Sequence, residues 1–213
     1  MVDIFDEVDE DLRADKARDL AKRYGGAVVA LALVIVLAAA VWQGWRWWQN
    51  KQDLAAGAEY IAAQSAVDAK NADAQSLLEQ VGRTAPAGYQ ALARLRLAAL
   101  KADAGDLPGA VAIWDRIAGD GSVDPLLRNV ATLAAVLRQS DSADPAQLQL
   151  LLKPLAAPDN PWHAMASEQL ALLDLRQGHL DAAKVTLRLL LQDSTVPNGV
   201  RNRVGGLLAQ LGG

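Results

Sequence analysis

The fold is decided by two stretches of sequence that follow one pattern: LRLAALKADAGDLPGAVAIWDRI at residues 95–117 and QLALLDLRQGHLDAAKVTLRLLL at residues 169–191. They align on Gly105 and Gly178. A glycine adopts at little cost the left-handed conformation that ends a helix, and small residues let two antiparallel helices approach closely. The pattern therefore predicts a repeated helix–turn–helix unit. Its aligned positions hold Leu97/Leu170, Leu107/Leu180, Ala98/Ala171, Ala110/Ala183 and the large pair Trp114/Leu187.

Turn-forming residues divide the rest of the chain after residue 49 into segments of about 10–20 residues, the usual length of globular helices. Within the segments, apolar residues recur at helical spacing, as Leu92, Leu95 and Ala99 do. No segment alternates as a strand does, so we predict an all-α fold. The breaks fall near residues 70–73, 84–88, 105–106, 119–125, 140–145, 158–161, 178 and 194–199.

Four of these breaks carry the residues that begin a helix. An Asp or Asn side chain accepts hydrogen bonds from the free N–H groups of a first turn, and proline is tolerated there because it has no N–H. Each combination of such a cap residue with a nearby proline predicts the start of a helix. The cap candidates are Asp106, two residues before a proline, and Asp124, Asp144 and Asn160, each directly before one.

The spacing of the repeat resembles that of the tetratricopeptide repeat. Gly105 and Gly178 are 73 residues apart, about twice the 34-residue period of that family. A degenerate unit at residues 124–157, with its turn at 141–145, fits between them. The family pattern expects a Trp and a Tyr on the first helix of each unit. This chain instead has Arg94 and Ser167 at the first position, and Lys101 and Asp174 at the second.

The N-terminal part of the chain contains a candidate transmembrane helix. Residues 24–45 carry no charge, and their core, residues 27–41, reads AVVALALVIVLAAAV. A spanning helix needs about 20 apolar residues. Two alternatives are a buried core helix, which is rarely apolar on every face, and a leader cleaved after residues 38–40. Aromatic residues at both ends favour a spanning helix: Tyr24 before it, and Trp42, Trp45, Trp47 and Trp48 at its end.

Flanking charges predict the orientation of this helix, because basic residues stay on the cytoplasmic side. Five bases precede the span and two follow it at a similar distance. We therefore expect a cytoplasmic tail at residues 1–23, a transmembrane helix at 24–48 and an outer domain at 49–213, which in a Gram-negative cell is periplasmic. The bases are Arg13, Lys16, Arg18, Lys22 and Arg23 before the span, and Arg46 and Lys51 after it.

Two neighbouring segments leave alternatives open. The tail holds eight acidic residues against five basic ones in residues 1–24, with Phe5, Val8 and Leu12 at helical spacing. It is either a docking helix for a cytoplasmic partner or a solvated tail. Residues 49–70 are expected to continue the spanning helix unless Gly57 breaks it. One side of that helix carries Leu54, Ala58, Ile61 and Ser65.

The whole chain is similar to the alphaproteobacterial members of one family, the ancillary subunit of the Sec translocon. The likeness rests on DIFDEVDEDLR at residues 3–13, KRYG at 22–25, GWRWW at 44–48 and the repeats that follow. It implies an inner-membrane protein with a periplasmic tetratricopeptide-like domain that associates with Sec translocon subunits and periplasmic chaperones. The repeat family also includes a secreted cell-division coordinator, so an envelope or cell-division scaffold without a link to export is the alternative function.

Catalysis is not expected. The chain lacks cysteine, and neither His163 nor His179 has a metal-ligand spacing to another histidine. No nucleophile, base and orienting group can be assembled, so we predict no cofactor, metal or small-molecule substrate. The net charge of −4 argues against nucleic-acid binding.

A protein-binding groove is the remaining candidate site, because the first helices of such repeats line the concave surface of a solenoid. An apolar groove with a few charges suits an extended polypeptide client. Alternatively, these side chains are plain core, or the final helix, near residues 197–211, fills the groove itself. The sequence leaves the partner and the oligomeric state open. The candidate residues are Leu92, Leu95, Ala99, Met165, Glu168, Leu172 and Arg176.

Overall fold

The computed structural model describes residues 4–212, with side chains for Lys22, Tyr24, Gly26, residues 29–31 and residues 33–212. The chain divides into two compact units, Met1–Asp53 and Leu54–Gly213. Every regular element among the described residues is a helix, which confirms the all-α prediction.

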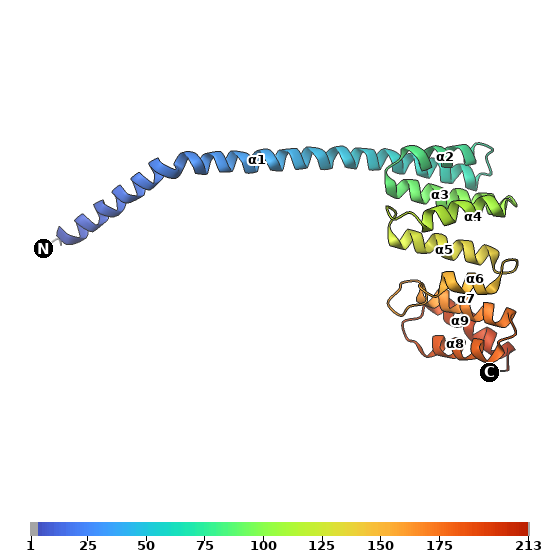
Figure 1. Cartoon of the computed structure of the whole chain (residues 1–213). Helices are drawn as coiled ribbons and strands as arrows, with labels where there is room; N and C mark the ends of the chain where they lie inside the picture. The colour runs from blue at the N-terminus through green and yellow to red at the C-terminus, as the bar shows by residue number, and fades with distance from the viewer. Residues whose placement is uncertain (1–3, 213) are drawn as a thin grey trace. The chain divides into compact units, whose positions relative to one another are not determined.

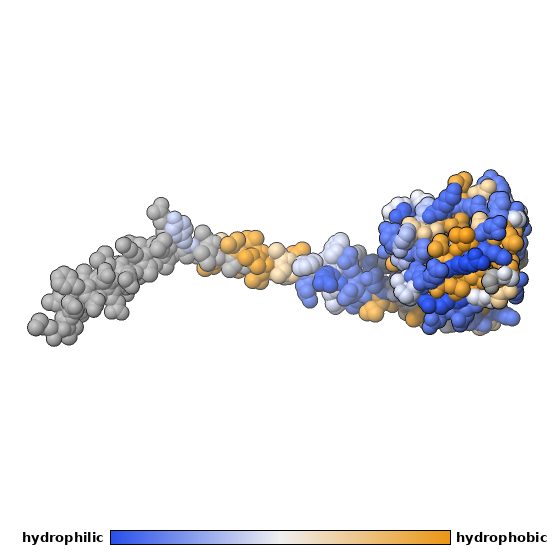
Figure 2. Space-filling view, turned by 90° about the horizontal axis from the view of Figure 1, so that it is seen from below, coloured by the Kyte–Doolittle hydropathy of each residue, from blue (hydrophilic) through white to orange (hydrophobic). Residues whose placement is uncertain are grey.

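The first unit consists of most of helix α1, which spans Ile4–Asp68. The apolar stretch of this helix forms the orange segment in Figure 2. By length and composition, α1 is the one helix in the described part of the chain able to cross a membrane, and its candidate span has a mean hydropathy of 1.8. Beyond the stretch, the Lys51 ammonium lies 4.4 Å from the centroid of the Trp47 ring. The side chains of Phe5, Val8 and Leu12 in the tail lie outside the described residues.

The second unit is a stack in which each helix packs against the next one in the chain, and α9 also contacts α7 (Figure 1). Each predicted break lies at or between two of them, so the helix positions are confirmed. The helices are α2 (Ala74–Thr84), α3 (Ala87–Asp103), α4 (Leu107–Ala118), α5 (Pro125–Gln139), α6 (Pro145–Leu152), α7 (His163–Arg176), α8 (Leu180–Gln192) and α9 (Asn198–Gln210).

The two aligned glycines end α3 and α7 as predicted. Gly105 has φ +90° and Gly178 has φ +80°. In both turns the N–H one residue later donates back to the carbonyl of the last helical turn: Asp106 to Lys101 at 2.9 Å, and His179 to Asp174 at 2.8 Å. This bonding satisfies carbonyls that a helix end otherwise leaves without partners.

The aligned alanines and large residues form the cores of two aligned helix pairs, the first repeat unit (α3–α4) and the second repeat unit (α7–α8). Ala98 and Ala110 are fully buried beside Trp114, which is 2% exposed. In the second repeat unit, Ala171 and Ala183 are fully buried beside Leu187. The small residues allow close helix contact and the large residue fills the space beyond them.

The three Asp-Pro or Asp-Xaa-Pro starts are confirmed, and the fourth is wrong. Asp106, Asp124 and Asp144 each accept a hydrogen bond from a first-turn N–H of the helix that follows. Asn160 accepts from the Trp162 N–H at 2.9 Å, but α7 begins only at His163. The Asn160 side chain therefore shapes a turn before the helix instead of capping it.

The C-terminal part of α1 packs on α2 and α3 within the second unit. Its core face carries Ala56, Tyr60, Ala63 and Val67. The helix continues through Gly57, where an added Cβ would lie 2.9 Å from the Tyr89 hydroxyl. The opposite side, which the sequence analysis singled out, is exposed; Leu54 is 75% and Ile61 66% accessible.

Candidate protein-binding surfaces

The predicted groove residues on α3 are half-buried. Leu95 and Ala99 pack against the cluster that holds Trp114 and Ala131, so they contribute to the contact between α3, α4 and α5. Leu92 is also partly buried. These positions therefore belong to the stack itself as much as to a surface.

The predicted residues on α7 are spread over several environments. Met165 packs against two hydrophobic clusters, and Leu172 is half-buried. Arg176 is exposed and donates a 2.6 Å hydrogen bond to the Ser140 carbonyl. Glu168 is buried, with 3% of its surface exposed.

The buried Glu168 carboxylate is held by the last helix. Arg203 of α9 donates from Nε at 2.7 Å and from Nη2 at 2.5 Å, one bond to each carboxylate oxygen. The hydrogen bond to Glu168 raises the pKa of Arg203 above its ordinary value. A bidentate pair of this kind fixes the angle as well as the distance between two helices.

Helix α9 occupies the place that the first helix of a following unit would take. The 73-residue correspondence continues past α8: Asp120 and Asp193 each accept from the N–H and hydroxyl of the residue two positions on, Ser122 or Thr195. Beyond that turn, α9 aligns with α5, and α9 contacts α7 as α5 contacts α3. Helix α9 thus packs on α7 and α8 and covers Glu168.

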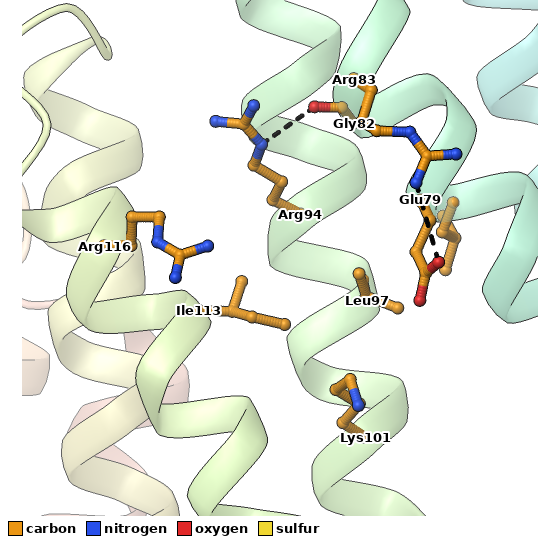
Figure 3. Close-up of a pocket in the computed structure, with 9 residues that line it drawn as sticks. Glu79, Gly82, Arg83, Arg94, Leu97, Lys101, Ile113 and Arg116 are labelled. Atoms are coloured by element: carbon orange, nitrogen blue, oxygen red, sulfur yellow. Dashed lines mark hydrogen bonds and ion pairs between the residues drawn. The ribbon is translucent and has the colours of Figure 1, made fainter.

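A basic hollow of ≈ 340 Å³, which the sequence analysis missed, lies between α2, α3 and α4. Its apolar lining is Leu78, Leu97 and Ile113, and Figure 3 shows the cationic side chains around it. The available signal was the departure from the tetratricopeptide pattern, since cations stand where the family places its Trp and Tyr. The basic residues are Arg83, Arg94, Lys101 and Arg116, and the acidic one is Glu79.

The four cationic side chains of the hollow differ in their hydrogen-bond and ion-pair partners. Arg94 donates from Nε to the Gly82 carbonyl at 3.0 Å and from Nη2 to Gln90 at 3.1 Å. Lys101 pairs with Asp106 at 2.9 Å. Arg83 lies 4.0 Å from Glu79. Arg116 forms no hydrogen bond or ion pair with any described residue.

The second repeat unit has a hollow of ≈ 310 Å³ at the aligned position, between α7 and α8. Ser167 and Leu189 stand there in place of Arg94 and Arg116. The two units thus share a hollow in the same place with different chemistry.

Helices paired through glycine turns and stacked into a solenoid define a class of repeat proteins that bind other proteins. A family model described as the tetratricopeptide repeat-like domain matches residues 18–184, and the chain belongs to this family. The match begins before the apolar stretch of α1.

Two similar solved structures are crystal structures of Podosopora anserina putative kinesin light chain nearly identical TPR-like repeats. The first has 17% identity and a TM-score of 0.55, and the match covers 72% of this chain and 83% of that one. The second, a variant of those repeats with one residue substituted, has 16% identity and a TM-score of 0.53, covering 72% and 91%. At these identities the likeness shows the fold alone. No curated protein matches the chain.

Proposed function

We propose that the chain is a membrane-anchored scaffold of the bacterial inner membrane that binds proteins beside the Sec translocon and assists their transfer to periplasmic chaperones. Residues 1–23 lie in the cytoplasm, residues 24–48 span the membrane, and residues 49–213 lie in the periplasm. One observation carries the proposal: a tetratricopeptide repeat-like domain follows an apolar helical stretch whose described side chains are exposed.

The anchor is supported by the cost of leaving α1 in water. The described apolar side chains between residues 29 and 45 are exposed. Covering apolar surface is worth roughly 25 cal/mol per Å², so this stretch favours a lipid environment strongly. The excess of basic residues before it supports a cytoplasmic N-terminus.

The link to export is supported by the N-terminal segments that resemble the ancillary Sec subunit, and by a repeat fold that presents surface for protein partners. Half-buried positions such as Leu172 then remain proposed contacts for an extended client, with Met165 and Glu168 supporting the stack beneath them. No chemistry on a substrate is part of this function.

Capture of neighbours in cells tests the proposal. A photoreactive amino acid is placed at Leu54 or Ile61, which are exposed near the anchor, and at Leu172, with Ser142 in an exposed turn as the matched control. Translocon subunits captured from the first two sites, and chaperones or exported chains from Leu172, are the expected result. Capture of only division or cell-wall proteins would contradict it and favour the envelope scaffold.

The orientation in the membrane is tested by a separate labelling experiment. Because the chain has no cysteine, a thiol reagent labels only the single cysteine introduced in each variant. We expect a membrane-impermeant maleimide to label Ser142→Cys in spheroplasts and Asp9→Cys only after the membrane is opened. The opposite pattern would place the repeats in the cytoplasm and remove the periplasmic part of the proposal.

A further inference from the structure

Two arginines face the basic hollow with unused hydrogen-bonding capacity. Arg116 on α4 has no partner among the described residues. The Arg94 guanidinium on α3 is positioned by the Gly82 carbonyl and Gln90, and its Nη1 has no partner in the described part of the chain. Figure 3 shows both side chains on adjacent helices next to Ile113. A guanidinium presents a planar fork of donors that matches a carboxylate.

The surplus of positive charge comes from these two arginines. Lys101 is neutralised by Asp106, and Arg83 lies near Glu79. Asp120 has a pKa below its ordinary value, mainly because Ser122 donates to it, and Arg94 and Arg128 lower it further. Asp120 therefore offsets part of the Arg94 charge, and no carboxylate among the described residues is within ion-pair distance of either guanidinium.

The lining of the hollow determines what kind of anion fits. Leu97 and Ile113 form an apolar surface between the cations, with Leu78 behind them. A lone inorganic anion leaves that surface in contact with water. An acidic side chain with an aliphatic neighbour satisfies the arginines and covers the leucine and isoleucine at the same time, which adds the hydrophobic contribution of the covered area.

We propose that this hollow binds an acidic segment of a partner protein, with a carboxylate on Arg94 and Arg116 and an adjacent aliphatic side chain on Leu97 and Ile113. The proposal rests on the protein-binding role argued above and names the partner's chemistry. It requires no particular location or export partner, so the two fail independently. Arg94 and Lys101 stand where the repeat pattern has its Trp and Tyr. The hollow is therefore lined by cationic side chains at these two positions.

The second hollow lacks the two arginines that this ligand requires. Ser167 and Leu189 occupy the positions aligned with Arg94 and Arg116, and Asp174 stands in place of Lys101. A carboxylate entering that hollow meets no guanidinium among the lining residues and approaches the carboxylate of Asp193, which lines it. The two hollows therefore form an internal pair of test and control.

The experiment measures binding of a fluorescein-labelled peptide, Ser-Gly-Glu-Leu-Asp-Glu-Leu-Gly-Ser, to the full chain in neutral detergent by fluorescence anisotropy. A matched peptide carries Gln and Asn in place of Glu and Asp. We expect the acidic peptide to bind at least about tenfold more tightly than the neutral one, which is the effect of 1.4 kcal/mol. Raising the salt concentration should weaken it, because screening acts on exposed charges.

Three variants locate the site. Arg116→Gln removes an exposed, unpartnered side chain and should fold normally while losing about tenfold in affinity. The double change Arg94→Ser with Arg116→Leu transfers the chemistry of the second hollow and should abolish the preference for the acidic peptide. Arg188→Gln, an equal charge change at an exposed position of α8, should leave binding unchanged. Circular dichroism confirms that each variant is folded.

Three results would overturn the proposal. The first is no saturable binding of the acidic peptide up to about 1 mM, which corresponds to a very weak complex. The second is equal binding of the peptide to a folded Arg116→Gln variant. The third is arginine-dependent binding to phosphatidylglycerol vesicles without peptide binding, which would make the hollow a lipid headgroup site. Failure of translocon capture in cells, with the peptide result intact, would contradict the export function and leave this inference standing.

Discussion

The units α3–α4 and α7–α8 have the same backbone plan and different side-chain chemistry at matching places. Both turn on a glycine with positive φ and both pack alanines against a large residue. One presents two arginines at its hollow, and the other presents Ser167 and Leu189. The comparison teaches that the turns and core positions set the repeat, whereas the hollow positions differ between the two units and are available for function.

The largest expected effect concerns the core residue that differs between the units. Trp114→Ala removes a buried indole and should lower the free energy of unfolding by about 3–5 kcal/mol, and Leu187→Ala should cost about 2–5 kcal/mol. Urea unfolding of the full chain in detergent, followed by circular dichroism, measures both. The exposed neighbour Val185→Ala is the control, with a change within about 0.5 kcal/mol. A Trp114→Ala cost near that of Val185→Ala would show that the indole is not core.

The next effect concerns the interface of each unit with the helix after it. Leu95 packs apolarly beside α5, whereas the aligned Glu168 pairs with Arg203 of α9. Arg203→Ala leaves a buried carboxylate without its partner and should cost about 2–3 kcal/mol. The cost is moderated because the Arg203 side chain is half exposed.

A double variant sharpens this comparison. Glu168→Leu with Arg203→Val installs the residues of the first unit, Leu95 and Val130, and removes both charges together. Because a buried ion pair is often replaced by apolar residues at little cost, we expect it to be more stable than Arg203→Ala alone in the same urea assay. A double variant less stable than Arg203→Ala would mean that α9 depends on the ion pair for its docking.

The two glycine turns should respond alike. Gly105→Ala and Gly178→Ala each force a Cβ into the left-handed region and should each cost about 1–2 kcal/mol. The turns belong to separate units, so the double variant should show the sum of the single costs within about 0.5 kcal/mol. A control, Gly121→Ala, changes a loop glycine with open space around it and without positive φ. A difference between the two turns beyond about 1 kcal/mol would break their equivalence.

Sequence reasoning succeeded where the signal is local. Turn glycines and cap residues act within a few positions of the chain, so Gly105 and Asp124 could be interpreted without a structure. It failed for contacts between distant positions: Arg94 bonds the carbonyl of Gly82, twelve residues earlier, and Arg203 reaches Glu168, 35 residues away. Which surfaces such residues share depends on how helices stack, which no local pattern contains. The basic hollow and the pairing of Arg203 with Glu168 therefore emerged only from the structure.

The smallest effect concerns a pair of aligned side chains with reversed chemistry. Lys101 pairs with Asp106 in the first unit, whereas Asp174 lies 3.8 Å from His179 in the second. The hydrogen bond from Lys101 and that from the Gly109 N–H lower the pKa of Asp106 below its ordinary value of 3.8. A carboxyl with a lowered pKa in the folded state stabilises the fold above pH 3.8, and this contribution is lost as the pH falls through the folded pKa.

Asp106→Asn keeps a good capping residue and removes the charge. We therefore expect the difference in urea midpoint between the natural chain and the variant to be present at about pH 6 and to shrink as the pH falls below 3.8. Lys101→Gln should reproduce part of the change, because it removes the larger cause of the lowered pKa. The effect is small because the carboxylate is exposed and its ion pair is screened by water. Parallel curves down to about pH 3 would show that the pair contributes nothing pH-dependent, and the two units would then differ here in sequence alone.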